Sequence, residues 1–151
     1  LLGEVDRPGC LTLRTSIIGR ELRGDRGLVE WFLAQRNTTV RGYTHAVFSG
    51  LPTVLLARVI GDLIHRSPQL SGLYHVAAAP ITKHDLLALL RDAYHLPVTL
   101  EPFDGVRLDR SLDGARFDRA TGFTAPPWAD LVQLLANDPT PYDTWRLSRG
   151  P

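Results

Sequence analysis

Residues 11–19, LTLRTSIIG, are the stretch that decides the fold. They are apolar and β-branched, about as long as one strand, and they close on Gly19. This composition is typical of a strand that is covered on both faces, as in a parallel sheet flanked by helices. Arg14, Thr15 and Ser16 place polar groups near its carboxyl end, where ligands lie in open α/β sheets. A core strand whose Thr and Ser only satisfy backbone groups is the alternative interpretation.

The composition limits the class of protein. A chain of 151 residues can form one domain with a real core. A net charge of +1 argues against a nucleic-acid partner, which would need a basic stripe. No apolar run approaches the roughly 20 residues that cross a bilayer, and no signal peptide opens the chain, so we expect no membrane partner. The single cysteine, Cys10, cannot form an internal disulfide, which favours a reducing, cytoplasmic location.

Apolar spacing predicts helices and strands in alternation, which indicates an α/β architecture. We expect helices at residues 28–35, 53–65, 83–94 and 129–136, and a short one within 111–120. We expect strands at 11–18, 72–78 and 97–100, an extended segment at 38–43, and a loop or edge strand at 44–50. Residues 101–110 are predicted to be a charged loop and residues 137–151 an extended terminus.

Two of the helices have N-cap signals. Thr53, preceded by Pro52, is the predicted N-cap of the helix at residues 53–65. Thr82, with Asp85 at the capping-box position, is the predicted N-cap of the helix at residues 83–94.

The predicted sheet is incomplete. Strands 11–18 and 72–78 both have the pattern of strands buried on two faces, yet the chain supplies no complete parallel sheet to receive them. A strand standing alone would leave edge groups unpaired. Because the chain also lacks methionine and begins with leucine, we expect it to be an internal or C-terminal piece of a longer protein.

Few residues have the spacing of a chemical site. The five histidines are well separated, and we expect no metal site. Arg110 and Ser111 come just before a short predicted helix, and Arg107 is a second candidate for binding phosphate oxygens with its guanidinium. The alternative is that Arg110 forms a surface ion pair with Asp109 or Asp113.

A family resemblance rests on a series of segments in one order: LLGE, LRTSIIG, VFSGLPT, GLYHV, ITKHDLL, DRSLDGARF and TGFTAPPW. Together they resemble the extended short-chain dehydrogenase/reductase family, and within it the dTDP-4-dehydrorhamnose reductases and related sugar-nucleotide-binding proteins. The resemblance implies that residues 1–145 are a C-terminal substrate-binding portion that includes the last strands of a Rossmann-type sheet. Residues 146–151 would be a tail. The implied fold is an incomplete parallel sheet with flanking helices.

The family's catalytic motif is missing from this chain. In the family, Tyr-x-x-x-Lys lies on a helix that commonly continues into Gly-Glu, and residues 1–4 resemble that continuation. The lysine would then immediately precede Leu1. The glycine-rich nucleotide loop is absent too. The resemblance therefore implies a parent NAD(P)-dependent reductase of 4-keto deoxysugar nucleotides, whose N-terminal Rossmann segment is a missing partner, and predicts that this chain alone is inactive.

The resemblance also implies roles for residues that are present. Thr15 and Ser16 would lie beside the nicotinamide of NADP or NAD. The implied substrate-binding residues are Ile17, Phe48, Ser49, Gly50, Thr53 and either Arg107 or Arg110. Arg107 or Arg110 would bind the diphosphate, although the family's Arg-Pro pair is absent before Ser111. No catalytic residue is expected within the chain.

Other functions stay open. The chain could belong to a non-catalytic sugar-nucleotide-binding or regulatory module, to an epimerase or dehydratase relative, or to a structural fragment that binds no ligand. A Tyr-x-x-x-Lys upstream of Leu1 would favour the enzyme. A homodimer is also left open.

Overall fold

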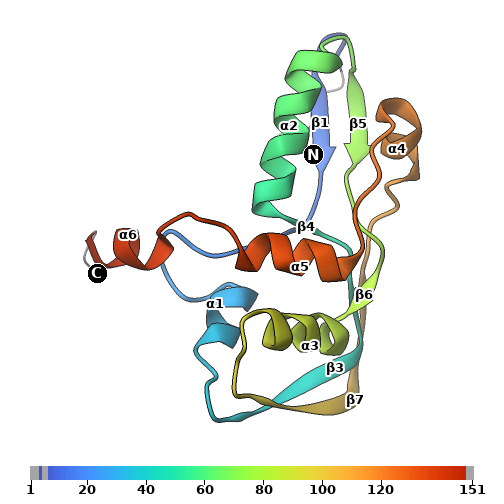
Figure 1. The fold of residues 1–151 in the computed structure, drawn as a ribbon. Coiled ribbons are helices and arrows are strands. Elements are labelled where there is room, and N and C mark those ends of the chain that lie inside the picture. The colour runs from blue at the N-terminus through green and yellow to red at the C-terminus, as the bar shows by residue number, and fades with distance from the viewer. Residues whose placement is uncertain (1–3, 5–6, 149–151) are drawn as a thin grey trace.

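The computed structural model describes residue 4 and residues 7–148 as an α/β molecule built around small sheets (Figure 1). In chain order the elements are β1 (Leu11–Arg14), β2 (Ile17–Ile18), α1 (Leu28–Leu33), β3 (Thr39–Phe48), β4 (Leu51–Pro52), α2 (Thr53–Arg66), β5 (Gly72–His75), β6 (Ile81–Thr82), α3 (Lys83–Ala93), β7 (Thr99–Arg110), α4 (Ala115–Thr121), α5 (Trp128–Ala136) and α6 (Tyr142–Ser148). None of the helices in this part of the chain has the length and apolar composition that a bilayer crossing requires.

Parallel strand pairs dominate the three sheets. β1 pairs with β5, and β2 pairs with β4, both in parallel. β3 is the centre of the third sheet, parallel to β7 on one side and antiparallel to β6 on the other. The first sheet lies with α2 and α4 in the upper part of Figure 1, and the third lies with α3 in the lower part. The predicted α/β class, with small parallel sheets and flanking helices, is confirmed.

The stretch 11–19 does not form one continuous strand. It leaves the β1–β5 sheet after Arg14, passes through Thr15 and Ser16, and re-enters strand geometry as β2 in a different sheet. Every residue of β1 is only half-buried, so the prediction of a strand covered on both faces is wrong for this structure. The strand expected at residues 72–78 is also shorter than predicted. β5 ends at His75, and residues 76–78 are buried without being part of a strand.

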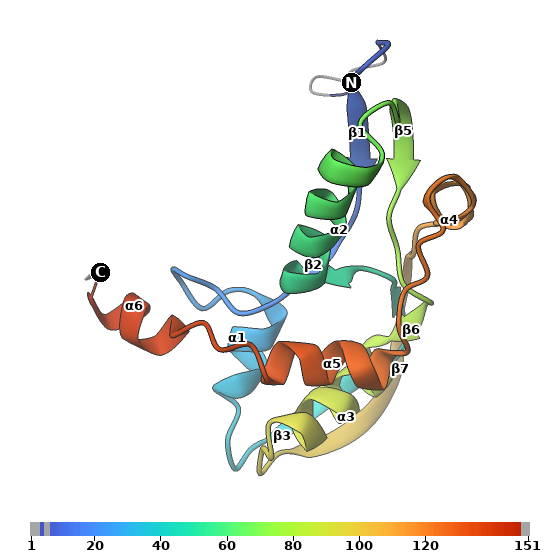
Figure 2. The same cartoon turned by 45° about the horizontal axis from the view of Figure 1, so that its top comes forward.

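The core of the lower part is made by α3. Its buried leucines, Leu86, Leu87 and Leu90, lie between the third sheet and α5, which contributes Leu131 and Val132. Figures 1 and 2 show α5 lying beside α3 in both views. The apolar spacing that predicted these two helices is the spacing that fills this core.

Several predicted elements differ from the structure. Residues 101–110, predicted to be a charged loop, belong to β7, and residues 38–43 and 44–50 merge into the single strand β3. The extended terminus contains α6, although the last residues of the chain lie outside the described part. Thr53 is the first helical residue of α2, and its predicted capping hydrogen bond is absent, because Pro52 occupies the N-cap.

The predicted cap of α3 is confirmed. Thr82 Oγ1 accepts a hydrogen bond of 3.1 Å from the Asp85 amide and donates one of 2.7 Å to the Asp85 carboxylate. The hydrogen bonds from Thr82 and then from His84 hold the pKa of Asp85 below its ordinary value. The cap therefore couples the start of α3 to the charge of one carboxylate.

Replacing Thr82 with alanine is expected to lower the free energy of unfolding by about 1 kcal/mol at pH 7. Because the pKa of Asp85 is lowered in the folded chain, its contribution is complete above the ordinary carboxyl pKa and is lost as the pH falls through the folded value. Urea titrations at pH 7 and pH 3 should show a smaller effect of Thr82→Ala in acid. Asp85→Asn is the control, since it removes the charge at every pH; an equal Thr82→Ala effect at both pH values would contradict this account.

Candidate functional site

The segments after β1 and β3 meet at one junction. The Leu51 amide donates a hydrogen bond of 2.9 Å to the Ser16 carbonyl oxygen, and Ile17 then pairs with Leu51 in the β2–β4 sheet. A Cβ atom on Gly50 would lie only 2.3 Å from that same Ser16 oxygen. Two predicted site residues, Ser16 and Gly50, are thus in direct backbone contact, and only glycine allows this approach.

Ser49 holds the junction to two other segments. Its hydroxyl oxygen accepts a hydrogen bond of 2.8 Å from the Leu112 amide, and its carbonyl oxygen accepts one of 2.8 Å from the Ala78 amide. The residue is 1% exposed. Its geometry is that of a residue that positions the site walls, and contact with a ligand stays a prediction.

A cleft of about 340 Å³ opens beside this junction. Its walls include three predicted substrate residues, Ile17, Phe48 and Thr53. They are joined by residues that the sequence did not single out: Ile18, Gly19, Arg20, Glu21, Gly27 and Leu28. Ile17 is 58% exposed, and the Phe48 ring packs 6.0 Å from that of Trp128. The cleft therefore offers apolar surfaces, one hydroxyl side chain and the charged residues Arg20 and Glu21.

A buried ion pair fixes the loop that forms one wall of the cleft. Arg20 Nε lies 2.5 Å from a carboxylate oxygen of Glu30, and that oxygen also accepts a hydrogen bond of 3.0 Å from the Glu21 amide. The Glu30 side chain is only 4% exposed. Arg20 also lies 2.6 Å from Asp143 of α6 and stacks over the Tyr142 ring. In both ribbon views the loop after β2 reaches toward α6 (Figure 2).

These contacts keep Arg20 charged. Burial by itself lowers the pKa of Arg20, but the hydrogen bonds and charges of Glu30 and Asp143 outweigh burial and raise it above its ordinary value. Because both sides of the guanidinium are engaged by carboxylates, Arg20 is a wall residue and is poorly placed to bind an anion. Sequence reasoning missed this network; the signal for it was the charged Glu30 within the otherwise apolar LVEWFL.

The strand register separates the two candidate arginines. Arg110 of β7 pairs with Phe48, which lines the cleft, whereas Arg107 pairs with His45. Since the two arginines are three residues apart in one strand, their side chains project from opposite faces of the sheet. Arg110 is therefore the cross-strand neighbour of a cleft residue, although it does not itself line the cleft.

The alternative ion pairs of Arg110 are not observed in the described residues. The Asp109 carboxylate instead accepts hydrogen bonds of 2.8 and 2.6 Å from the amide and hydroxyl of Ser111, which hold the pKa of Asp109 below its ordinary value. Asp113 accepts a hydrogen bond of 2.9 Å from the Ala115 amide. Both carboxylates are engaged by the turn before α4.

Thr15 and Ser16 lie at the carboxyl end of β1 and are half-buried. The Thr15 hydroxyl donates a hydrogen bond of 3.1 Å to the Ser16 carbonyl oxygen. Neither residue lines the 340 Å³ cleft. Their position matches the edge at which open α/β sheets bind ligands, and their role beside a cofactor stays a prediction.

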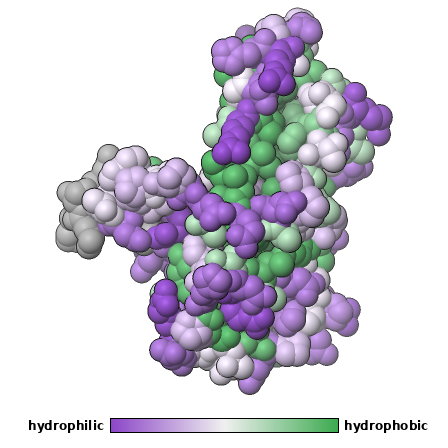
Figure 3. All heavy atoms as spheres, viewed as in Figure 1, coloured by the Kyte–Doolittle hydropathy of each residue, from purple (hydrophilic) through white to green (hydrophobic). Residues whose placement is uncertain are grey.

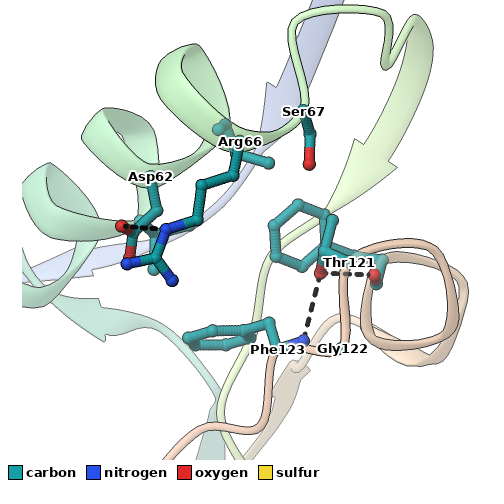
Figure 4. A pocket seen from close by; sticks show the side chains of 9 residues that line it. Asp62, Arg66, Ser67, Thr121, Gly122 and Phe123 are labelled. Atoms are coloured by element: carbon teal, nitrogen blue, oxygen red, sulfur yellow. Dashed lines mark hydrogen bonds and ion pairs between the residues drawn. The ribbon is translucent and has the colours of Figure 1, made fainter.

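Other features do not extend this site. A hollow of about 220 Å³ between α2 and α4, with Phe117, Phe123 and Arg66 in its walls, contains none of the predicted residues (Figure 4). Within residues 4 and 7–148, no group of three His, Cys, Asp or Glu side chains is arranged to hold a metal ion. Cys10 is a half-buried free thiol.

Comparison with solved structures identifies the fold. The dTDP-4-dehydrorhamnose reductase from Yersinia enterocolitica is 16% identical, with a TM-score of 0.67 over 83% of this chain and 48% of its own. The corresponding enzyme from Bacillus anthracis, solved in complex with NADP, is 18% identical, with a TM-score of 0.64 over 83% and 46%. The UDP-N-acetylglucosamine 4-epimerase from Bacillus cereus is 14% identical, with a TM-score of 0.65 over 84% and 47%.

At these identities the likeness concerns the fold alone. The resemblance inferred from the sequence is confirmed at that level, since the structural neighbours are dTDP-4-dehydrorhamnose reductases and related epimerases and dehydratases. No family model and no curated protein matches the chain. The chain spans less than half the length of the structures described above.

Proposed function

We propose that this chain is the sugar-nucleotide-binding portion of an NAD(P)-dependent sugar-nucleotide reductase that acts on a 4-keto deoxysugar nucleotide. The observation that carries the proposal is that Ile17, Phe48 and Thr53 line one cleft while the strand register places Arg110 next to Phe48. The structural neighbours support the reductase over other uses of the fold, and an epimerase is the second candidate because one neighbour is a 4-epimerase. A cytoplasmic location belongs to the same proposal.

Each wall of the cleft has a role in this proposal. The exposed face of Ile17 packs against the sugar ring, and the Thr53 hydroxyl bonds to it. Ser49 and Gly50 set the distance between the two walls through their contacts with Leu112 and Ser16. This division gives apolar packing for the ring and a small number of polar groups for its orientation, as small-molecule sites commonly do.

Arg110 is assigned to the diphosphate. A guanidinium binds phosphate oxygens through paired hydrogen bonds, and Arg110 is exposed and unengaged by a carboxylate among the described residues. Arg107 projects from the other face of the strand and is not assigned this role.

The hydride donor of such a reductase is a nicotinamide cofactor, NADP or NAD. This chain would contribute Thr15 and Ser16 beside it, at the carboxyl end of β1. The proton-transfer pair has to come from elsewhere, because the only lysine, Lys83, has Ala79 and no tyrosine four residues before it. Residues 1–145 therefore fit the substrate half of the enzyme.

An apolar surface is available for the missing half. Ile60 and Ile64 of α2 are 41% and 66% exposed, and they border a hollow of about 440 Å³ whose walls also include Leu11 and Leu13 of β1. Figure 3 shows apolar residues gathered along this upper part of the molecule beside a strip of polar ones. We assign this surface to the Rossmann segment that would precede Leu1; a homodimer remains a second way to cover it.

Replacing Arg110 with alanine is expected to weaken dTDP binding by about tenfold or more, because a charge-assisted contact to the diphosphate is lost. Isothermal titration calorimetry of the chain with dTDP measures this. Arg107→Ala is the matched control and should change affinity by less than about twofold. The two variants should bind thymidine, which has no phosphate, with equal affinity. Equal losses for both variants, or no binding of dTDP by the unsubstituted chain, would contradict the proposal.

A further inference from the structure

The hollow between α2 and α4 is a pocket that the proposed function does not use (Figure 4). It has a volume of about 220 Å³ and shares no residue with the cleft beside Ile17. Because a cavity of about 150 Å³ can hold a benzene ring, this hollow has room for an aromatic side chain and part of a polar head group. Its interior is apolar and aromatic, whereas its rim along α2 carries charges.

The aromatic wall of the hollow is fixed by the turn that ends α4. Gly122 adopts a left-handed conformation with a φ of 72° and reverses the chain, so that the Phe123 ring packs 5.7 Å from the Phe117 ring. The Thr121 hydroxyl donates a hydrogen bond of 2.8 Å to the Phe117 carbonyl oxygen and accepts one of 3.2 Å from the Phe123 amide. Phe117 is fully buried and Phe123 only half-buried. A further aromatic or branched side chain can therefore pack against this pair of rings.

Asp62 and Arg66 form the charged rim. They lie one turn apart on α2, and Arg66 Nε is 3.5 Å from the Asp62 carboxylate. Their side chains are exposed, so this ion pair contributes little to stability and can open at little cost. Figure 4 shows both side chains on the α2 side of the hollow and Phe123 on the other side. The rim thus presents one anion and one cation beside an apolar interior.

The end of α2 affects which ligand charge this rim accepts. α2 ends at Arg66, and the C-terminus of a helix is the negative pole of its dipole. Together with Asp62, this pole favours a cationic group, while the Arg66 guanidinium favours an anionic one. A ligand that carries an ammonium and a carboxylate close together matches both charges at once.

We propose that the hollow binds a free apolar α-amino acid in its zwitterionic form. The ligand's ammonium pairs with Asp62 and its carboxylate pairs with Arg66, so two charge pairs replace one. The side chain of the amino acid enters the apolar interior and packs against Phe117 and Phe123. The Ser67 hydroxyl, which also lines the hollow, offers one more hydrogen bond to the head group.

The rim is separate from the surface assigned to the missing segment. Ile60 and Ile64 of that surface are each two residues away from Asp62 in sequence, and positions two apart lie on nearly opposite sides of a helix. Covering Ile60 and Ile64 would therefore leave the charged rim open. Binding of the amino acid does not depend on the proposed function or on dTDP.

The test is a titration of the full chain with L-phenylalanine, followed by amide chemical shifts in NMR spectra. Saturation is expected with a dissociation constant of about 1 mM or lower, with the largest shifts at Ser67, Gly122 and Phe123. Each of three analogues lacks one feature: 3-phenylpropionate the ammonium, phenethylamine the carboxylate and glycine the side chain. Each is expected to bind about fivefold or more weakly than L-phenylalanine. No saturable shifts at these residues, or equal binding of any analogue, overturns the proposal.

Variants of the rim assign the two charges. Arg66→Gln should bind L-phenylalanine and phenethylamine equally, and Asp62→Asn should bind L-phenylalanine and 3-phenylpropionate equally. Arg58→Gln is the matched control, since Arg58 lies on the same helix outside the hollow, and its affinity should change by less than about twofold. All three positions are exposed, so the variants are expected to fold with unchanged urea midpoints. Unchanged affinity of both rim variants for L-phenylalanine, or an equal loss in Arg58→Gln, overturns the proposal.

Discussion

Replacing Gly50 with alanine is expected to lower the free energy of unfolding by about 3 kcal/mol. The added Cβ would lie 2.3 Å from the Ser16 carbonyl oxygen and 2.3 Å from Phe48 Cζ. The Phe48 ring can rotate only by disturbing its packing against Trp128. The Ser16 oxygen is backbone and already accepts the hydrogen bond from Leu51, so the strand junction itself must open. Chemical denaturation followed by circular dichroism measures the loss.

Gly61→Ala is the matched control for this substitution. Gly61 lies inside α2, and a Cβ there would meet no atom within 4 Å. Since alanine forms helices better than glycine, the free energy of unfolding of this variant is expected to rise by about 0.5–1 kcal/mol. The same chemical change should therefore have opposite signs at the two sites. A Gly50→Ala chain as stable as the unsubstituted one would show that the junction is looser than the structure has it.

Replacing Glu30 with alanine is expected to lower the free energy of unfolding by about 3–5 kcal/mol, because the change leaves the buried guanidinium of Arg20 without its main partner. Arg20 is only 16% exposed, and Glu30 also accepts the hydrogen bond from the Glu21 amide. The loop between β2 and α1 loses two attachments in one substitution. Urea titration measures the stability, and dTDP calorimetry should show weaker binding because this loop is a wall of the cleft.

Asp143→Ala tests the exposed end of the same network. Asp143 also contacts Arg20, but its side chain is 78% exposed, so water replaces it at little cost. Asp143→Ala is therefore expected to lower the free energy of unfolding by no more than about 1 kcal/mol. If the two substitutions had equal effects, the burial of Glu30 would not be the source of the stability.

The sequence predicted the elements that carry their own hydrophobic pattern. α2, α3 and α5 have apolar faces at helical spacing, and Thr82 and Asp85 mark one of their starts without reference to the rest of the fold. β7 could not be found this way. Most of its residues are exposed, so its sequence has no apolar alternation, and its strand geometry comes from hydrogen bonds to β3, which is distant in the chain.

In the candidate site, too, some features could be predicted from the sequence and others depend on contacts between distant segments. The resemblance placed Ile17, Phe48 and Thr53 at a shared site, and the structure puts them around one cleft. It could not choose between the two arginines, because that choice depends on the register of β7 against β3. The contact of Arg20 with Asp143 joins residues far apart in sequence, and no local pattern marks it.

The parallel pairing of β1 with β5, and of β3 with β7, determines how the chain must reach its native state. Each pair joins strands about 60 residues apart, so neither can form until a long loop has closed. The helices between them are local and can form much earlier. Contact order is therefore high for a chain of this size, and refolding should be limited by the search for these strand partners. Until that search ends, β7 offers an open template on both edges, which makes the interval before pairing the period of greatest exposure to aggregation.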